Sequence, residues 1–228
     1  MLVVEWMTRD PITLGPGDTV GTAAETMARR NIRRIPIVEH GAVVGIVAKS
    51  DVLNACPADF NPFSAEAVGG PPLVTPLHQI MSAHPLTVRP DAPVEAAAQL
   101  MVEHKIGGLP VVSEGPEGEK DAGGSARHAR ARLVGILTES DLFRALTAAL
   151  GGGGPGLRVT FDVSNDEDPI RFILELARRH GLRLASLSTH EREGRRSAVV
   201  RLLGAEPAGL MDDLWKTGHR VLSVLRMT

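Results

Sequence analysis

Two aspartates occupy matching positions in a repeated motif, and their chemistry makes them the first candidates for a functional role. Ser50-Asp51 and Ser140-Asp141 each follow a β-branched run and open a predicted helix. An ionised aspartate can accept hydrogen bonds from two vicinal hydroxyls of a sugar, and the N–H groups at a helix N-terminus suit phosphate oxygens. Residues of these types at a helix start are therefore candidates for contacts to a sugar or a phosphate.

The same spacing also has a purely structural interpretation. Thr138-Glu139-Ser140-Asp141, just before Leu142 and Phe143, resembles a capping box, in which side chains satisfy the backbone N–H groups of a helix start. The sequence leaves both interpretations open. The first copy reads Ala48-Lys49-Ser50-Asp51 and lacks the threonine hydroxyl, so the two sites are expected to differ.

These motifs belong to an internal repeat that covers the first two-thirds of the chain. The segment from Met7 to Thr13 recurs from Met81 to Thr87, at an offset of 74 residues (81 − 7). Further on, Gly45-Ile46-Val47 matches Gly135-Ile136-Leu137 at an offset of 90 (135 − 45). Two such copies are expected to pack about a pseudo-twofold axis with equivalent clefts between them.

Each repeat reads as strand, helix, strand, strand, helix. Apolar residues at helical spacing from Val20 to Met27 predict a helix with one buried face, and Asp18 is its expected N-cap. Two β-branched runs flank Glu39-His40-Gly41-Ala42, which predicts a hairpin. In the second repeat, residues 114–131 interrupt the same hairpin, and their glycine and charge content indicates a surface loop.

A different unit follows a glycine-rich break. Its element order, β-α-β-β-α-β, predicts a ferredoxin-like antiparallel sheet with both helices on one face. Asp168-Pro169 is expected to start its first helix and Gly181 to end it. The predicted boundaries are 1–56 for the first repeat, 57–76 for a linker, 77–148 for the second repeat, 149–156 for the glycine-rich linker and 157–228 for the last unit.

Composition narrows the class of protein. A net charge of −2 argues against a nucleic-acid partner, and a single cysteine, Cys56, favours a reducing compartment. No apolar run approaches the roughly 20 residues that span a bilayer, and Glu5 interrupts any signal-peptide pattern. We therefore expect a soluble cytoplasmic protein without a membrane partner. The histidines and the cysteine show no metal-ligand spacing, so no metal site is expected.

The repeated motifs resemble a tandem pair of CBS domains, a Bateman module. The resemblance rests on Met-Thr/Ser…Pro-x-Thr, Ile/Leu-Pro-Ile/Val and Gly-Ile-Val/Leu…Ser-Asp, each present in both repeats. The last unit looks like an ACT domain, and the combination is similar to the acetoin-utilisation AcuB-type proteins. The fold class expected is α/β (α+β), with two CBS domains about a pseudo-twofold axis and a ferredoxin-like ACT domain.

The resemblance implies a non-enzymatic regulatory protein that binds an adenine nucleotide (AMP, ADP or ATP) between the CBS copies. In the family, the threonine and the aspartate of Thr-x-x-Asp contact phosphate and ribose. The nucleotide-binding residues that this implies are Thr13, Ile35, Pro36, Ser50 and Asp51 in the first repeat, and Thr87, Leu109, Pro110, Thr138, Ser140 and Asp141 in the second. For the strand residues among them, ordinary β packing is the alternative.

Arg34 is the cation expected to neutralise a phosphate. Arg33-Arg34 precede Ile35-Pro36, whereas the second repeat has Gly107-Gly108 at the same place. An arginine pair that balances a helix-end dipole is the alternative.

Two other functions compete with a nucleotide sensor. One is an assembly scaffold with vestigial clefts, and the other is a nucleotide-processing enzyme, for which the sequence shows no assembled acid, base or metal. In the ACT-like unit, Pro169 is followed by Ile170 where amino-acid-binding members have glycine. Pairing of sheet edges into a homodimer is therefore the expected role of that unit.

Overall fold

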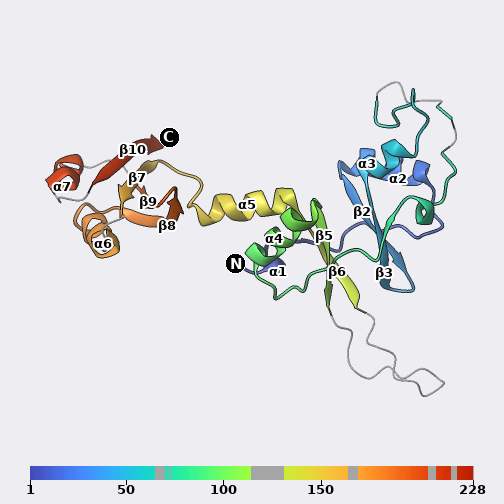
Figure 1. The fold of residues 1–228 in the computed structure, drawn as a ribbon, viewed down its shortest axis with the longest axis horizontal. Helices are drawn as coiled ribbons and strands as arrows, with labels where there is room; N and C mark the ends of the chain where they lie inside the picture. The colour runs from blue at the N-terminus through green and yellow to red at the C-terminus, as the bar shows by residue number, and fades with distance from the viewer. Residues whose placement is uncertain are drawn as a thin grey trace, which may run out of the picture. The chain divides into compact units, whose positions relative to one another are not determined.

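The computed structural model describes residues 1–64, 70–71, 73–113, 131–163, 169–204, 209–216 and 220–227 (Figure 1). The interrupting loop predicted at 114–131 lies outside the described residues except for Ala131, as does Asp168, the expected helix cap. Contacts divide the chain into an N-terminal unit, Met1–Phe143, and a C-terminal unit, Arg144–Thr228. This division falls within helix α5 (Glu139–Ala149), ahead of the glycine-rich segment predicted as a linker.

The N-terminal unit contains two hairpins with helices packed beside them. Its elements are α1 (Val3–Trp6), β1 (Thr8–Arg9), α2 (Val20–Arg30), β2 (Arg34–Glu39), β3 (Ala42–Ala48), α3 (Lys49–Asn54), the 3-10 turn η1 (Leu77–Gln79), β4 (Ser82–Ala83), α4 (Val94–His104), β5 (Gly108–Ser113), β6 (Arg132–Thr138) and the start of α5.

Local sequence signals explain the hairpin and the start of α2. Glu39 pairs with Ala42, and both residues between them have positive φ, as a two-residue hairpin turn requires. The expectation for Asp18 was wrong. Thr19 is the N-cap, and its hydroxyl accepts from the N–H of Thr22 at 3.2 Å. The Asp18 carboxylate instead accepts from the N–H of Gly15 at 2.7 Å, and this hydrogen bond closes the turn before the helix.

The two repeats exchange their first strands. β1 pairs with β6 of the second repeat, where Thr8 lies opposite Ile136. β4 pairs with β3 of the first repeat, where Ser82 lies opposite Ile46. The offsets of 74 and 90 carry one pairing onto the other, so they are the same contact seen twice about the pseudo-twofold axis. The predicted symmetric packing is therefore confirmed.

The short helical segments are exchanged as well. Val3 of α1 is fully buried in the core of the second repeat, and Leu77 of η1 is fully buried in the core of the first. The Val3 N–H donates to the carbonyl of Ala92 at 2.9 Å, and the Leu77 N–H donates to that of Asp18 at 2.8 Å. Each core is therefore complete only when the other repeat supplies its first residues.

A methionine–glycine contact accompanies each exchanged strand. A Cβ on Gly135 would lie 2.5 Å from Met7 Sδ and 3.0 Å from the Thr8 carbonyl oxygen. A Cβ on Gly45 would collide with Met81 Sδ in the same way. The glycine of each Gly-Ile-Val/Leu motif thus provides the space into which the methionine of the other repeat fits.

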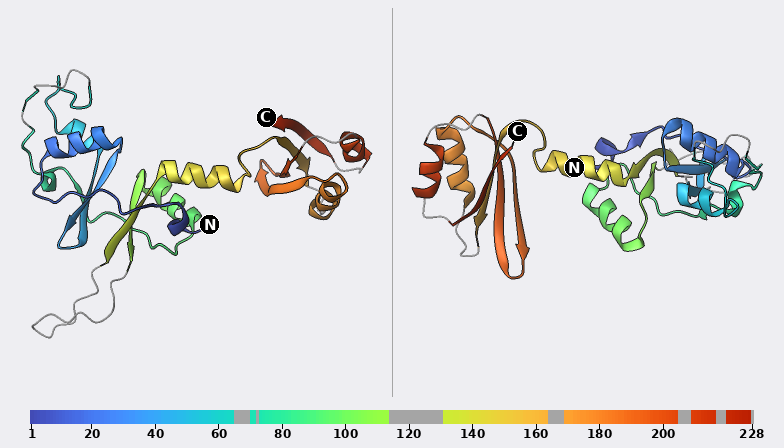
Figure 2. Two further views of the ribbon diagram at one scale, coloured as in Figure 1. Left: turned by 180° about the vertical axis from the view of Figure 1, so that it is seen from behind. Right: turned by 90° about the horizontal axis from the view of Figure 1, so that it is seen from above.

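The C-terminal unit has the predicted ferredoxin-like order. Its elements are β7 (Gly156–Asp162), α6 (Pro169–Arg179), β8 (Arg183–Arg192), β9 (Arg195–Leu203), α7 (Leu210–Lys216) and β10 (Val221–Met227). The strands form one antiparallel sheet in the order β10-β7-β9-β8. Both helices cover the same face (Figure 2), and their apolar side chains pack with Phe161 and Val200.

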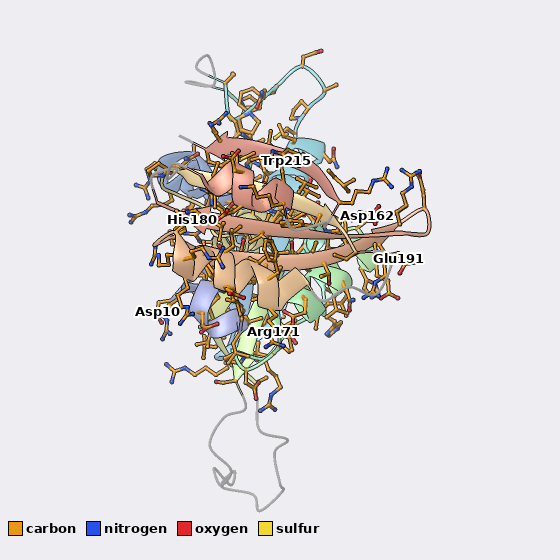
Figure 3. The ribbon with its side chains drawn as sticks, turned by 90° about the vertical axis from the view of Figure 1, so that its left-hand side faces the viewer. Asp10, Asp162, Arg171, His180, Glu191 and Trp215 are labelled. Atoms are coloured by element: carbon orange, nitrogen blue, oxygen red, sulfur yellow. The ribbon has the colours of Figure 1, made fainter. Side chains whose placement is uncertain are left out.

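A polar contact joins the two helices at the edge of this core. His180 follows α6 and is labelled in Figure 3. Its Nε2 atom lies 3.0 Å from Asp213 Oδ2 of α7, and Arg179 Nη1 lies 3.6 Å from the same oxygen. The hydrogen bond with His180 lowers the pKa of the Asp213 carboxyl below its ordinary value. Gly181, with φ of +65°, lets the chain turn after the helix, as predicted.

The close contact between Gly135 and Met7 predicts that a larger residue at position 135 destabilises the N-terminal unit. Gly135→Ala should lower the free energy of unfolding of the N-terminal unit by about 1–3 kcal/mol, because the added methyl overpacks the Met7 contact. Urea denaturation followed by Trp6 fluorescence, in a Trp215→Phe background, measures this unit alone. Gly17→Ala is the control, since a Cβ there meets nothing within 4 Å. An equal cost for Gly135→Ala in a Met7→Ala background would contradict the interpretation.

Candidate functional site at the interface of the repeats

Both predicted carboxylates hold the start of their own helix. Asp51 Oδ2 accepts from the Ala48 N–H at 2.7 Å, and Asp141 Oδ2 accepts from the Thr138 N–H at the same distance. These bonds satisfy N–H groups that a helix start leaves without an intrahelical partner. The structural interpretation of the repeated aspartate is thus realised in both repeats.

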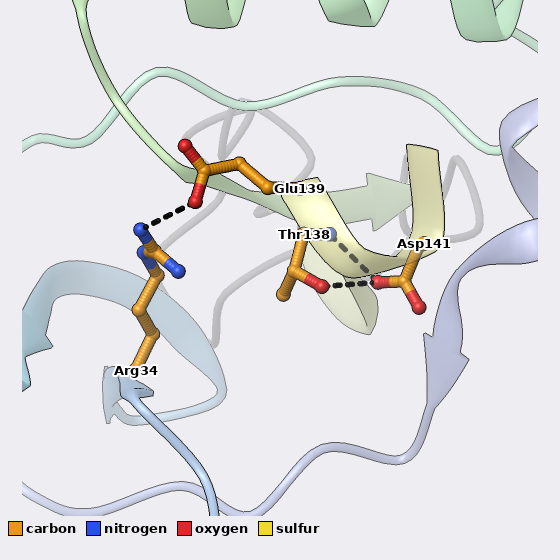
Figure 4. Close-up of polar contacts among 4 residues, drawn as sticks. All are labelled: Arg34, Thr138, Glu139 and Asp141. Carbon is orange, nitrogen blue, oxygen red and sulfur yellow. Dashed lines mark hydrogen bonds and ion pairs between the residues drawn. The ribbon is translucent and has the colours of Figure 1, made fainter. Parts of the chain in front are cut away.

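The two helix starts differ by one hydroxyl. Thr138 Oγ1 lies 2.7 Å from Asp141 Oδ2 and donates a second hydrogen bond to that oxygen (Figure 4). Ala48 has no side chain that can do the same for Asp51. Asp141 is only 2% exposed, whereas Asp51 is partly buried. The second carboxylate is therefore the more firmly fixed of the two.

Arg34 reaches from the first repeat to the second. Its Nη2 atom lies 3.5 Å from Glu139 Oε2, next to Thr138 (Figure 4). The side chain of Arg34 is 22% exposed and that of Glu139 is 57% exposed. Because Arg34 lies in β2, it does not belong to a helix end, and the helix-dipole alternative is wrong for this residue.

The glycines of the second repeat make this reach possible. A Cβ on Gly108 would lie 2.8 Å from Arg34 Cδ, and one on Gly107 would collide with the guanidinium. Positions 34 and 108 are equivalent in the repeat, so their contact places them at the pseudo-twofold axis. A second arginine there would bring two like charges together, which is unfavourable. The change from Arg-Arg to Gly-Gly therefore lets one cation occupy the axis.

Comparison with known proteins gives the family. The CBS domain model matches residues 3–58 and 77–119. The CBS domain-containing protein YhcV of Bacillus subtilis is 30% identical over 140 residues, which cover 61% of this chain and 81% of YhcV. The chain belongs to the CBS-domain proteins. The protein MJ1225 of Methanocaldococcus jannaschii is 29% identical over 145 residues, 63% of this chain and 46% of MJ1225, so the chain spans less than half of that relative.

Solved structures of CBS pairs are also similar. One is the CBS domain pair of protein MJ0100 in complex with 5′-methylthioadenosine and S-adenosyl-L-methionine, with 27% identity and a TM-score of 0.48, covering 64% of this chain and 95% of that one. Another is the Vibrio cholerae protein named acetoin utilization protein AcuB, with 31% identity and a TM-score of 0.48, covering 64% of this chain and 91% of that one.

Most of the strand residues that were predicted to bind the nucleotide are buried. Ile35 and Leu109 are fully buried in the cores of their repeats, so these side chains pack as strand residues do. Pro36 and Pro110 are buried as well, and their carbonyls accept from the N–H groups of Leu14 and Val88 at 3.3 and 3.1 Å. Thr13 and Thr87, just before those residues, are exposed, as are Ser50 and Ser140 at the helix starts.

Sequence reasoning missed the role of Glu139. Its equivalent in the first repeat is Lys49, whose ammonium lies 4.2 Å from the ring centre of Phe63. That reversal of charge at a repeated position was the available signal. It gives the second CBS repeat an acidic partner for Arg34 that the first repeat does not have.

Among the described residues, no group of three or more histidine, cysteine, aspartate and glutamate side chains is placed to hold a metal ion. None of the described helices is both long and apolar enough to span a membrane.

The missing hydroxyl of the first repeat predicts a stabilising substitution. Ala48→Thr should add the second hydrogen bond to Asp51 and raise the free energy of unfolding of the N-terminal unit by about 0.5–1.5 kcal/mol. Ala48→Val, which has the same shape without the hydroxyl, is the control. Urea denaturation with Trp6 as the reporter separates the two variants. Equal stability of the threonine and valine variants would show that the hydroxyl forms no such bond.

Proposed function

We propose that the CBS pair is the ligand-binding part of a non-enzymatic, cytoplasmic regulatory protein, and that its ligand is an adenine nucleotide (AMP, ADP or ATP). The observation that carries the proposal is the position of Arg34. This cation of the first repeat pairs with Glu139 of the second, and Gly107 and Gly108 leave the space that its side chain occupies. A guanidinium that reaches the first residue of a helix suits a phosphate, because both the cation and the N–H groups of a helix start favour an anion.

The ion pair suggests how a nucleotide would change the protein. In this structure the counter-ion of Arg34 is Glu139, and the pair joins the two repeats. A phosphate bound at the interface would compete with Glu139 for the guanidinium and replace a contact between repeats by a contact to the ligand. A ligand shifts such an equilibrium only by its difference in affinity for the two arrangements. As the biological role of the protein, we propose regulation in acetoin- or acetate-type metabolism.

A scaffold with vestigial clefts is the second candidate, and the geometry of Asp141 favours it. That carboxylate is nearly inaccessible and accepts two hydrogen bonds from Thr138. A nucleotide sensor must expose one of its oxygens to a ribose, whereas a scaffold needs only the cap. Thermal-shift measurements across AMP, ADP, ATP, dinucleotides and S-adenosylmethionine separate the two functions, because a scaffold shows no stabilisation by any of them.

If phosphate and Glu139 compete for Arg34, substitutions at positions 34 and 139 should change the affinity for AMP in opposite directions. Arg34→Gln should weaken AMP binding about tenfold or more, because it removes a charge-assisted contact. Glu139→Gln should tighten it up to about fivefold, because a half-exposed ion pair contributes at most about 1 kcal/mol. Titration calorimetry on the full chain measures both. Glu25→Gln, which breaks the exposed pair with Arg29, is the control and should have no effect. Changes of equal sign at positions 34 and 139 would exclude the competition.

We further propose that the C-terminal unit is an ACT-like domain that forms a homodimer through β10 or relays the ligand signal. β8 and β10 are the two edges of its sheet. β8 carries the exposed charged residues Arg183 and Glu191, which protect an edge, whereas β10 exposes Leu222 and Leu225 beside one exposed charged residue, Arg226. The less protected edge is the better surface for a second copy.

Sedimentation of the full chain tests this assignment. The protein should behave as a dimer, and Leu225→Lys should shift it toward monomer, because the substitution brings like charges together across the paired edges. Leu174→Lys on α6 is the matched control, since the two leucines are 54% and 49% exposed. A monomeric parent protein, or equal dissociation in both variants, would contradict a dimer through β10.

A further inference from the structure

The C-terminal unit contains a pocket on the sheet face opposite α6 and α7. Alternate residues of β7 and β9, such as Val159 and Val200, pack under the helices, so their neighbours Arg158 and Arg201 face the other way. This face forms one wall of a pocket of about 340 Å³, and the glycines at 152–154 form another. A pocket of this volume is at the lower end of the range for small-molecule sites.

Two arginines face each other in this pocket. Arg158 and Arg201 are direct partners in the antiparallel register of β7 and β9. Like charges at directly opposed positions are unfavourable, and no carboxylate is among the described residues that line the pocket. The arrangement therefore carries a concentrated positive charge that a small anion would neutralise.

Arg201 has unused hydrogen-bonding capacity in this place. It is 8% exposed, and its Nη2 atom donates to the carbonyl of Gly154 at 3.0 Å. Its Nε atom is buried and has no hydrogen-bond partner among the described residues. A buried donor without an acceptor is uncommon in a native structure and indicates an acceptor that is still to be supplied.

The other residues of the pocket define the size and character of a ligand. Ser186 and Ser188 of β8 present hydroxyls, and the Ser186 hydroxyl already donates to the carbonyl of Leu150 at 2.9 Å. Leu150, Val199 and Met227 add apolar surface. Two guanidiniums, a free serine hydroxyl and a short apolar wall suit a compact molecule with one anionic group. A nucleotide is larger than this kind of ligand.

We propose that this pocket binds a small organic oxyanion, a carboxylate or a phosphate with a short aliphatic body. Arg158 and Arg201 hold the anionic group, and the wall of Leu150 and Val199 receives the aliphatic part. The site lies entirely within the C-terminal unit and is separate from the residues proposed for the nucleotide. The bond from Arg201 to the carbonyl of Gly154 connects this anion site to the glycines at 152–154.

Nuclear magnetic resonance on the full chain tests the proposal directly. The Nε–Hε signal of Arg201, assigned by its loss in Arg201→Lys, is followed while butyrate or inorganic phosphate is added. A saturable shift with one anion supports the site and decides between carboxylate and phosphate. Butylamine, a cation of the same length as butyrate, should cause none. No saturable shift with either anion, at a dissociation constant of about 10 mM or tighter, would overturn the proposal.

Two variants separate this site from a general effect of charge. Arg158→Gln should weaken binding of the active anion about tenfold or more, since it removes a charge-assisted contact while leaving Arg201 in place. Arg183→Gln removes an exposed arginine of the same sheet that is not part of the pocket, and it should leave the affinity unchanged. Arg34→Gln should also leave the Arg201 signal unaffected. Unchanged affinity in Arg158→Gln, or an equal loss in Arg183→Gln, would refute the assignment.

Discussion

The N-terminal unit depends on one contact made twice, the packing of a methionine of one repeat against a glycine of the other. Met7 meets Gly135 and Met81 meets Gly45, and each contact fixes the first strand of one repeat on the hairpin of its partner. The same exchange buries the short helical segments in the opposite cores. Because neither core is complete alone, the interface between the repeats is part of the folding unit, and a change there affects both halves.

Some equivalent positions at or beside the pseudo-twofold axis carry different residues in the two repeats. At the pseudo-twofold axis, equivalent positions must share the same space, so Arg34 requires Gly108 opposite it. The neighbouring charge is reversed between the repeats, with Glu139 in one and Lys49 in the other. A duplicated scaffold has in this way acquired an ion pair between its copies. We propose that a phosphate binds beside that pair.

The C-terminal unit follows a different principle, the separation of two sheet faces. One face is closed by α6 and α7 over a continuous apolar core. The other presents arginines and serines and is partly covered by the chain after α5, through the bonds to Leu150 and Gly154. A sheet with one closed and one open face can hold its fold with the first and offer the second to a ligand. The two units thus present two chemically distinct surfaces within one chain.

The sequence by itself determined the repeat, the hairpin turn, the helix faces and the β-α-β-β-α-β order, because each of these depends on residues close together in the chain. His40-Gly41 shows this most simply, since two positive φ angles specify the turn. The sequence also predicted that Asp51 and Asp141 begin helices, but it left capping and ligand binding as alternatives. Only the atomic contacts revealed that both carboxylates cap.

The tertiary structure alone decided which repeat each first strand joins and what Arg34 contacts. Glu139 is 105 positions from Arg34, and no local rule of spacing connects them. The opposed pair of Arg158 and Arg201 likewise exists only through the register of two strands. The physical reason is common to all three cases. Periodicity reports which face of an element is apolar, whereas the partner of that face, and of any charge on it, is fixed by packing between segments that the chain brings together from a distance.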